Sequence, residues 1–474
     1  MKSFLALFMV LAINAVLGTS LKESSNSADI LVITRQKFVQ SITSYKTWRG
    51  AQGFDVKIVT LEEILAEFPS LQYFNSIKEF MDVVFIKWYK HPQYALLVGS
   101  YMALPSYPIS APYSFGGSSD VDNYYVIEEE EDIFKLRIPI GRLAVDTAEQ
   151  LDAILLKLRH VESNKDIDQY GFDFLFIADD GPPGDNLDVF EHQVESLVSL
   201  LPANQRWQRM DLDSSSQFYG TRIDLFDFLQ RKPLFLYFAG LANAGLWGHE
   251  SILTSLDVDS MNNINTPFFI LGSLCESFYS SNPREILIQR FLCEPEKGAF
   301  GAIASTGPVF TNQFDSLAQN ILKEMFRGSS PRLGDIFLGA MNSLDKSLRG
   351  VSELAHFFSF SIIGDPCLIL PLQIHAHADI DKDHSEHTFE LKQNYPNPFN
   401  PRTTIEFFLA TDEIVDLKVY NVLGQPVATL LSKKPMPAGT YSIPFDGSHL
   451  LSGSYIYTLS AGELQQAKRM VLLK

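Results

Sequence analysis

The chain has 474 residues, and its composition already excludes some classes of protein. So long a chain exceeds one compact core, so two or three domains are expected. Hydrophobic residues make up 46% and charged residues 20%, which is typical of a globular protein. The formal net charge of −18 argues against nucleic acid as a partner, because a phosphate backbone is bound by a basic face.

The first twenty residues have the pattern of a secretory signal peptide. Lys2 gives a positive start, an apolar run follows from Phe4 to Leu17, and small residues occupy positions 18–20. We expect cleavage near residues 18–20; a membrane anchor is the alternative. No later stretch approaches the roughly 20 apolar residues of a spanning helix, so we expect no membrane span after cleavage.

The first half of the mature chain alternates strand and helix patterns. Buried strands are predicted at 30–34, 54–60 and 93–100. Between them, helical spacing of apolar residues appears over 39–53 and 77–91. This order is typical of a parallel, doubly wound sheet.

The same alternation then restarts. Buried strands are predicted at 173–181, 233–240, 267–275 and 298–306, with a helix over 189–201. We therefore expect two α/β units laid end to end.

Ligands of such sheets bind beyond the carboxyl ends of the strands. We expect a site among four such ends: Gly99–Ser100, Asp179–Asp180, Gly240–Leu241 and Ser273–Cys275.

Composition divides the chain into parts. The signal peptide covers 1–20, the first α/β unit 28–164 and the second, site-bearing unit 165–372. Residues 373–390 are polar and rich in histidine, which indicates a linker. From 391 to 474 the sequence alternates with period two between regular turns, which predicts a small antiparallel, immunoglobulin-like sandwich.

The C-terminal part carries a family likeness. "NYPNPFNP" at 394–401 and the terminal "KRMVLLK" resemble the C-terminal sorting domain of type IX secretion cargo. The resemblance covers 391–474 and implies recognition by an outer-membrane translocon after signal-peptide cleavage. It further implies a secreted or cell-surface location, often with removal of the sorting domain.

The α/β part resembles gingipain-type cysteine peptidases, relatives of caspases. The likeness is carried by "YALLVGSYMALPSY" (94–107), "SDVDNYY" (119–125), "GRLA" (141–144), "FLFIADDG" (174–181) and "GDP" (364–366). It implies a caspase-like α/β/α fold, cysteine-type peptidase chemistry and a protein or peptide substrate.

The family performs its chemistry with a histidine and a cysteine. The histidine follows one strand in a Gly-His-Gly, ahead of a Trp, and takes the proton of a cysteine that follows the next strand. On this chain Cys275 matches the nucleophile, and its separation from Leu241 fits the family's spacing. Leu241 stands in place of the histidine and Ala242 in place of the second glycine, so the resemblance predicts a nucleophile without its base.

Two other histidines are candidate substitutes for that base. His249 is the weak alternative, because it lies after Trp247 and closer to Cys275 than the family's histidine does. His192 is weaker still. Cys275 itself has a plain alternative role, because free cysteines are often buried packing residues.

Three hypotheses for function stay open at this point. The first is a gingipain-family protein whose hydrolysis is doubtful because Leu241 replaces the base. The second is an active cysteine endopeptidase that uses Cys275 with His249. The third is a non-enzymatic surface binding or adhesion protein.

Some residues suggest further features without a firm place. No cofactor is required, although the acidic run at 128–132 makes calcium binding an option. Asp179 and Asp180 either contact a cationic substrate side chain or cap their loop. With three cysteines at least one thiol is unpaired, and a disulfide between Cys293 and Cys367 is one option.

Overall fold

The computed structural model divides the chain into two compact units, Met1–Gln373 and Ile374–Lys474. Most of the predicted signal peptide and of the predicted linker lies outside the residues described. The structure describes residues 19–110, 118–130, 133–164, 169–180, 189–202, 205–248, 250–273, 286–307, 311–327, 330–344, 360–371, 389–391, 394, 397, 399–409, 413–421, 425–437, 439–461 and 464–473.

The first unit is built on one ten-stranded sheet with the order β10-β9-β11-β15-β16-β17-β8-β3-β1-β2. Its strands are β1 (Ile30–Thr34), β2 (Val56–Thr60), β3 (Tyr94–Val98), β8 (Ile140–Leu143), β9 (Phe172–Ala178), β10 (Trp207–Asp211), β11 (Pro233–Ala239), β15 (Phe268–Ser273), β16 (Ala299–Ser305) and β17 (Phe360–Ile363). Most are apolar throughout because both faces of the sheet are covered.

Strand direction reverses once within this sheet. β16 pairs with β17 antiparallel, while every other neighbouring pair is parallel. Strands of the first half therefore end at one edge of the sheet, and β9, β11 and β15 end at the other. We call these the first-half edge and the second-half edge. Of the four strand ends where a site is expected, Gly99–Ser100 therefore lies at the first-half edge, apart from Asp179–Asp180 and Gly240–Leu241.

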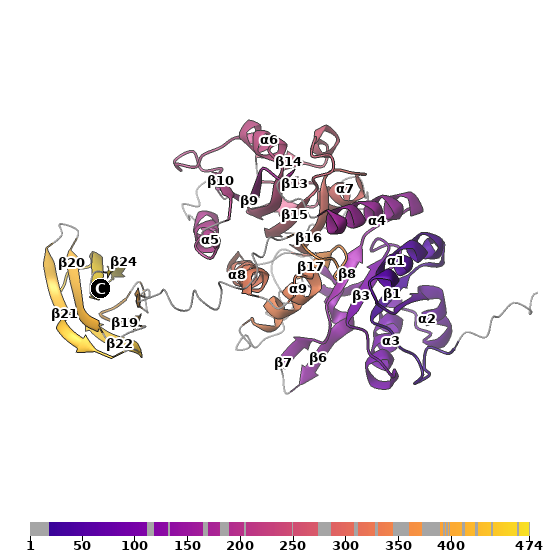
Figure 1. Cartoon of the computed structure of the whole chain (residues 1–474), viewed down its shortest axis with the longest axis horizontal. Coiled ribbons are helices and arrows are strands. Elements are labelled where there is room, and N and C mark those ends of the chain that lie inside the picture. The colour runs from indigo at the N-terminus through magenta and orange to yellow at the C-terminus, as the bar shows by residue number, and fades with distance from the viewer. Residues whose placement is uncertain are drawn as a thin grey trace, which may run out of the picture. The chain divides into compact units, whose positions relative to one another are not determined.

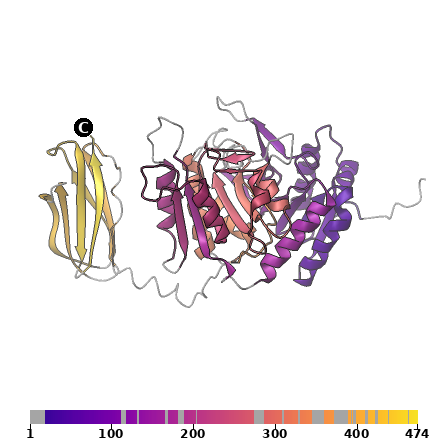
Figure 2. The same ribbon diagram turned by 90° about the horizontal axis from the view of Figure 1, so that it is seen from above.

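Helices cover both faces of the sheet (Figures 1 and 2). Helices α1, α4 and α7 contact one another in sequence along one face, and α5, α8 and α9 do so along the other. Their bounds are α1 (Val39–Ala51), α2 (Leu61–Glu67), α3 (Tyr73–Lys87), α4 (Ala148–Ser163), α5 (Val189–Val198), α6 (Arg222–Gln230), α7 (Leu287–Cys293), α8 (Thr311–Arg327) and α9 (Leu333–Asn342).

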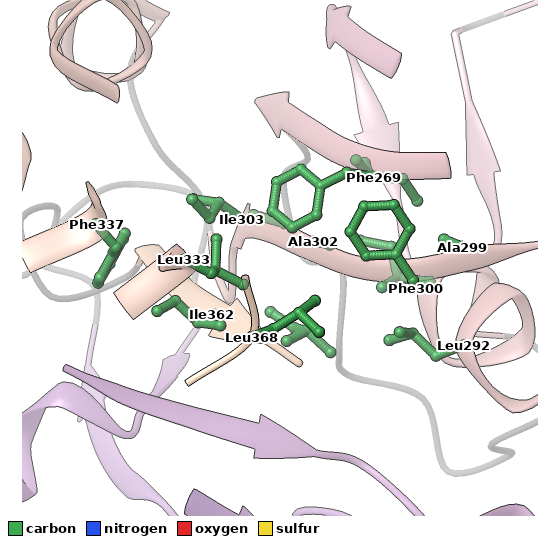
Figure 3. Packing of buried hydrophobic residues seen from close by; sticks show 14 of the residues in the cluster. Phe269, Leu292, Ala299, Phe300, Ala302, Ile303, Leu333, Phe337, Ile362 and Leu368 are labelled. Carbon is green, nitrogen blue, oxygen red and sulfur yellow. The ribbon is translucent and has the colours of Figure 1, made fainter. Parts of the chain in front are cut away.

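The core continues across the point where strand direction reverses. Figure 3 shows Ile303 of β16 and Ile362 of β17 near Leu333 of α9. Phe269 of β15 lies next to Phe300 of β16, with ring centroids 5.6 Å apart. The prediction of a doubly wound α/β/α domain is confirmed. No helix in the described part of the chain is both long and apolar enough to cross a membrane.

Two buried arginines fasten the first half. Arg142 of β8 is fully buried and donates to both carboxylate oxygens of Asp122, at 2.6 and 2.7 Å. It also donates to the carbonyls of Gly99 and Leu104, each at 2.8 Å. We call this group the Arg142 lock; it holds the loop after β3 against β8.

Arg49 of α1 is equally buried. It bonds Asp365, which follows β17, at 2.6 Å, and Glu162 of α4 at 2.8 Å. Trp48 stacks on its guanidinium, whose central carbon lies 3.9 Å from the ring centroid. This arginine therefore joins α1, α4 and the turn after β17.

The second unit is all-β. It contains a sheet with the order β18-β19-β22 and a sheet with the order β21-β20-β23-β24, both antiparallel, around a separate core. The small β unit predicted from alternation is confirmed. Its strands are β18 (Phe389–Leu391), β19 (Arg402–Leu409), β20 (Glu413–Asn421), β21 (Pro426–Met436), β22 (Gly439–Asp446), β23 (Gly453–Ala461) and β24 (Leu464–Leu472).

Candidate functional site

Three neighbouring strands end together at the second-half edge. In the sheet register Ala239 of β11 lies opposite Ala178 of β9 on one side and Ser273 of β15 on the other. The residues that follow these strands therefore meet at one place. Asp179 follows β9 there, and Gly240 and Leu241 follow β11.

Asp179 holds the loop that follows β11. Its carboxylate is fully buried and accepts the backbone N–H of Leu241 at 2.8 Å and that of Asp180 at 3.1 Å. Its own backbone N–H donates to the carbonyl of Ala239 at 2.8 Å. These are the contacts of a loop cap, one of the two roles considered for this residue.

Gly240 is required by close packing. A Cβ atom at this position would lie 2.4 Å from the Cβ of Asp179 and 2.6 Å from the ring of Phe238. No side chain fits there without a backbone shift. The glycine therefore lets Asp179 approach the backbone of Leu241.

The loop then forms a small sheet of its own. It has three short strands, β12 (Ala242–Asn243), β13 (Leu246–Trp247) and β14 (Leu253–Thr254). Trp247 is buried and stacks on Phe238 of β11, with ring centroids 5.1 Å apart. The N–H of Gly248 donates to the carbonyl of Leu241 at 2.8 Å, so both backbone groups of Leu241 are bonded.

Of the three catalytic positions predicted from the sequence, Leu241, Cys275 and His249, the structure describes Leu241. Leu241 is 39% exposed, at the second-half edge of the sheet. Cys275 and His249 lie outside the described residues, so their roles stay predictions. His192 lies exposed on α5.

Carboxylates gather beside Leu241. Asp179, Asp180 and Glu250 each place an oxygen within 4.8 Å of the others, an arrangement that could hold a cation. Glu250 was not singled out from the sequence, where only its position directly after "GH" marks it. Calcium at 128–132 stays a prediction: Glu128 and Glu130 lie in the hairpin of β6 (Ile127–Glu130) and β7 (Ile133–Leu136), and residues 131–132 are not described.

The two cysteines that the structure describes are both free thiols, so the disulfide considered between them is wrong. Cys293 ends α7, and Cys367 follows the turn after β17. Burial raises the pKa of each thiol to about 12, which makes both poor nucleophiles at neutral pH.

Known proteins match both parts of the chain. Residues 23–371 match Peptidase family C25, and residues 393–473 match the secretion system C-terminal sorting domain. No curated protein matches the chain.

Solved structures of peptidases have the same fold. The crystal structure of the Arg-specific cysteine proteinase gingipain R has a TM-score of 0.60 at 16% identity, covering 95% of this chain and 99% of that one. The complex of pro- and mature domains of a gingipain from Porphyromonas gingivalis gives 0.58 at 16% identity, covering 94% and 100%. A structure described only as a protease gives 0.57 at 14% identity, covering 93% and 96%. At these identities the likeness shows the fold alone.

These matches confirm the two resemblances drawn from the sequence, that of the α/β part and that of the sorting tail. The family match covers nearly all of the first unit, including the three strand ends described above. The chain belongs to Peptidase family C25, a family of cysteine peptidases, and carries a secretion sorting domain at its C-terminal end.

Proposed function

We propose that this is an exported member of the family that does not hydrolyse peptides, and that it binds a peptide or protein at the second-half edge. The observation that carries the proposal is Leu241. It occupies the histidine's place by resemblance, it is half-exposed at the strand ends, and its backbone is held on both sides.

The chemistry of the family explains why a leucine matters here. A thiol must lose its proton before it attacks a carbonyl, and an adjacent base normally takes that proton. Leucine has no lone pair to accept it, and an apolar neighbour raises a thiol's pKa further. Removing the base of a comparable hydrolase costs on the order of 10⁶ in kcat.

The proposed binding role uses what the edge retains. Leu241 offers an apolar contact, and the carboxylates of Asp180 and Glu250 offer polar ones near it. Such a mixture of apolar surface and a few polar groups suits a peptide or a protein loop. No cofactor is needed for this role.

Export is proposed from both ends of the chain. Residues 1–20 have the signal-peptide pattern, and the sorting-domain match at 393–473 implies handling by the type IX machinery. We infer a secreted or cell-surface protein whose tail is read by the translocon.

The decisive experiment restores the base. The mature protein, Leu241→His, Leu241→Asn and Cys275→Ala are each incubated with a mixed peptide library, and products are read by mass spectrometry. Asn has nearly the size of Leu and is polar but is no base, so it is the matched control. We expect no cleavage by the unmodified protein or Leu241→Asn, and cleavage by Leu241→His that disappears when Cys275→Ala is added.

Other outcomes have definite meanings. Cleavage by the unmodified protein that is lost in Cys275→Ala contradicts the proposal. If His249→Ala, as a separate variant, also abolishes that cleavage, the active-endopeptidase hypothesis is favoured. If Leu241→His also stays silent, binding is tested directly by recovering peptides from the library on the unmodified protein. Absence of any bound peptide would leave the scaffold hypothesis.

A further inference from the structure

A buried lysine of α4 lies against the end of α7 and the start of β16, and no sequence pattern predicted its burial. Lys157 of α4 is 3% exposed, and no carboxylate in the described part of the chain accepts a hydrogen bond from it. Its Nζ instead donates to four backbone carbonyls, at 2.7 to 3.0 Å. They belong to Phe291 and Leu292 in the last turn of α7, and to Lys297 and Ala299 where the chain enters β16.

The geometry explains why a cation is buried here. The last carbonyls of a helix have no intrahelical donor, and a buried carbonyl without a donor is costly. An ammonium supplies three donors and no acceptor, so at least one of its N–H groups is shared between two of the four carbonyls. A neutral amine, with two donors, would serve them less well. Burial lowers the pKa of Lys157 to about 7, opposed by Cys293 and Glu294 nearby.

The far end of α7 is bonded to the site loop. The N–H of Leu287, the first residue of α7, donates to the carbonyl of Ala244 at 2.7 Å. Phe291 meets Trp247 edge-on, with ring centroids 6.3 Å apart. Because Trp247 stacks in turn on Phe238, α7 supports the loop that carries Leu241.

The structure assigns Lys157 as a positioning residue of the candidate site. It fixes the end of α7 against α4, and α7 fixes the loop 242–248 through Leu287 and Phe291. Helices α4 and α7 lie side by side (Figure 1), so a helix of the first half braces the site of the second half. The assignment rests on the proposed function only in taking the second-half edge as the site.

Hydrogen exchange on the full chain tests this assignment. Exchange is followed by mass spectrometry at pH 6, where Lys157 is protonated, in peptides covering 242–248 and 286–293. Lys157→Met has nearly the same length but no donor. We expect exchange at least tenfold faster in both peptides, with little change in the second unit.

Arg49→Met is the matched control, because it removes an equally buried cation that bonds Asp365 and Glu162. At a temperature where this variant stays folded, exchange in the two peptides should match that of the unmodified protein. If Lys157→Met does not fold, Lys157→Gln keeps two donors and should give a smaller change in the same direction.

Two results would overturn the assignment. Faster exchange in 286–293 alone would mean that Lys157 stabilises α7 without positioning the site loop. Equal acceleration in Arg49→Met would mean that both peptides report global stability. Neither readout needs catalysis or a ligand, so failure of the proposed function leaves this test intact.

Discussion

The two edges of the sheet use buried charge in different ways. At the first-half edge, Arg142 closes the loop after β3 with charge-assisted hydrogen bonds to Asp122 and to the backbone carbonyls of Gly99 and Leu104. At the second-half edge, the Asp179 carboxylate accepts the backbone N–H groups of Asp180 and Leu241, and Leu241 itself is half-exposed. A buried arginine closes the loop after β3, whereas the loop after β11 is held by its backbone and leaves Leu241 accessible.

The comparison shows why strand ends alone do not identify a site. Both edges carry ends of parallel strands, where ligands of α/β sheets bind. The first-half edge is filled by its own arginine, whereas the second-half edge presents a bonded backbone with an open side-chain position. Accessibility distinguishes them, and four predictions test that difference.

The largest expected effect concerns the thiol at the first-half edge. Cys367 has a pKa of about 12 in the folded protein, raised by burial. At pH 8 its thiolate fraction is roughly 10⁻⁴, against about a quarter for an ordinary thiol. We expect iodoacetamide to label Cys367 on the order of 10³ times more slowly in the folded protein than in urea, measured by peptide mass spectrometry.

The pH dependence of that labelling has a definite sign. In the folded protein the rate should rise about tenfold per pH unit from 7 to 9.5, while in urea it levels off above the ordinary pKa of about 8.5. Because the folded state keeps a proton that the unfolded state loses, this thiol lowers the unfolding free energy as pH rises above about 8.5. Labelling at equal rates in both states would mean that the first-half edge is open.

The second prediction breaks the Arg142 lock. Arg142→Met leaves the Asp122 carboxylate buried without its partner, which costs about 3–5 kcal/mol of unfolding free energy. Urea denaturation measures the loss. Arg35→Met removes a partly exposed pair with Glu62 and should cost less than about 1 kcal/mol. Similar costs for the two variants would show that the lock is not closed.

The third prediction fills the space beside Asp179. Gly240→Ala places a Cβ against Asp179 and Phe238, so we expect a loss of about 1–3 kcal/mol and weaker protection of the Leu241 amide from exchange. Gly50→Ala in α1 meets nothing within 4 Å and should stabilise the protein by about 0.5–1 kcal/mol. If Gly240→Ala leaves the unfolding free energy unchanged, the loop is loosely held.

The smallest effect concerns the far side of the site loop. Burial alone would raise the pKa of Asp257, but hydrogen bonds from Arg222 and Thr254 hold that pKa below its usual value. Its contribution to stability is therefore complete above pH about 4 and is lost as pH falls through the lowered pKa. Because Arg222 is 44% exposed, Asp257→Asn should cost less than about 1 kcal/mol at pH 7. The difference from the unmodified protein should shrink as pH falls through that lowered pKa, as followed by chemical denaturation.

Much of the fold was predictable because its elements are locally encoded. The first strand was predicted at 30–34 and is found at Ile30–Thr34, since its apolar run is bounded by polar residues. The reversal at β17 was not predictable. An apolar run such as "FSII" does not indicate in which direction its strand will run in the sheet. That direction depends on the strands with which it pairs.

The site was predictable in position and only partly in structure. The motif placed Leu241 at a strand end, where the structure has it. The bond from its backbone to Asp179 joins residues 62 positions apart, a pairing that no local pattern encodes. Lys157 was missed for a similar reason, because a lysine in an amphipathic helix is usually solvent-exposed. The predictions for Cys275 and His249 remain to be tested.

The exposure of Leu241 also has a consequence for the history of this gene. The fold holds the backbone at that position through Asp179 and leaves the residue 39% exposed, so we expect polar substitutions there to be tolerated. Some leucine and histidine codons differ by a single base. Under the proposed function, a single base change could therefore place a histidine at this position.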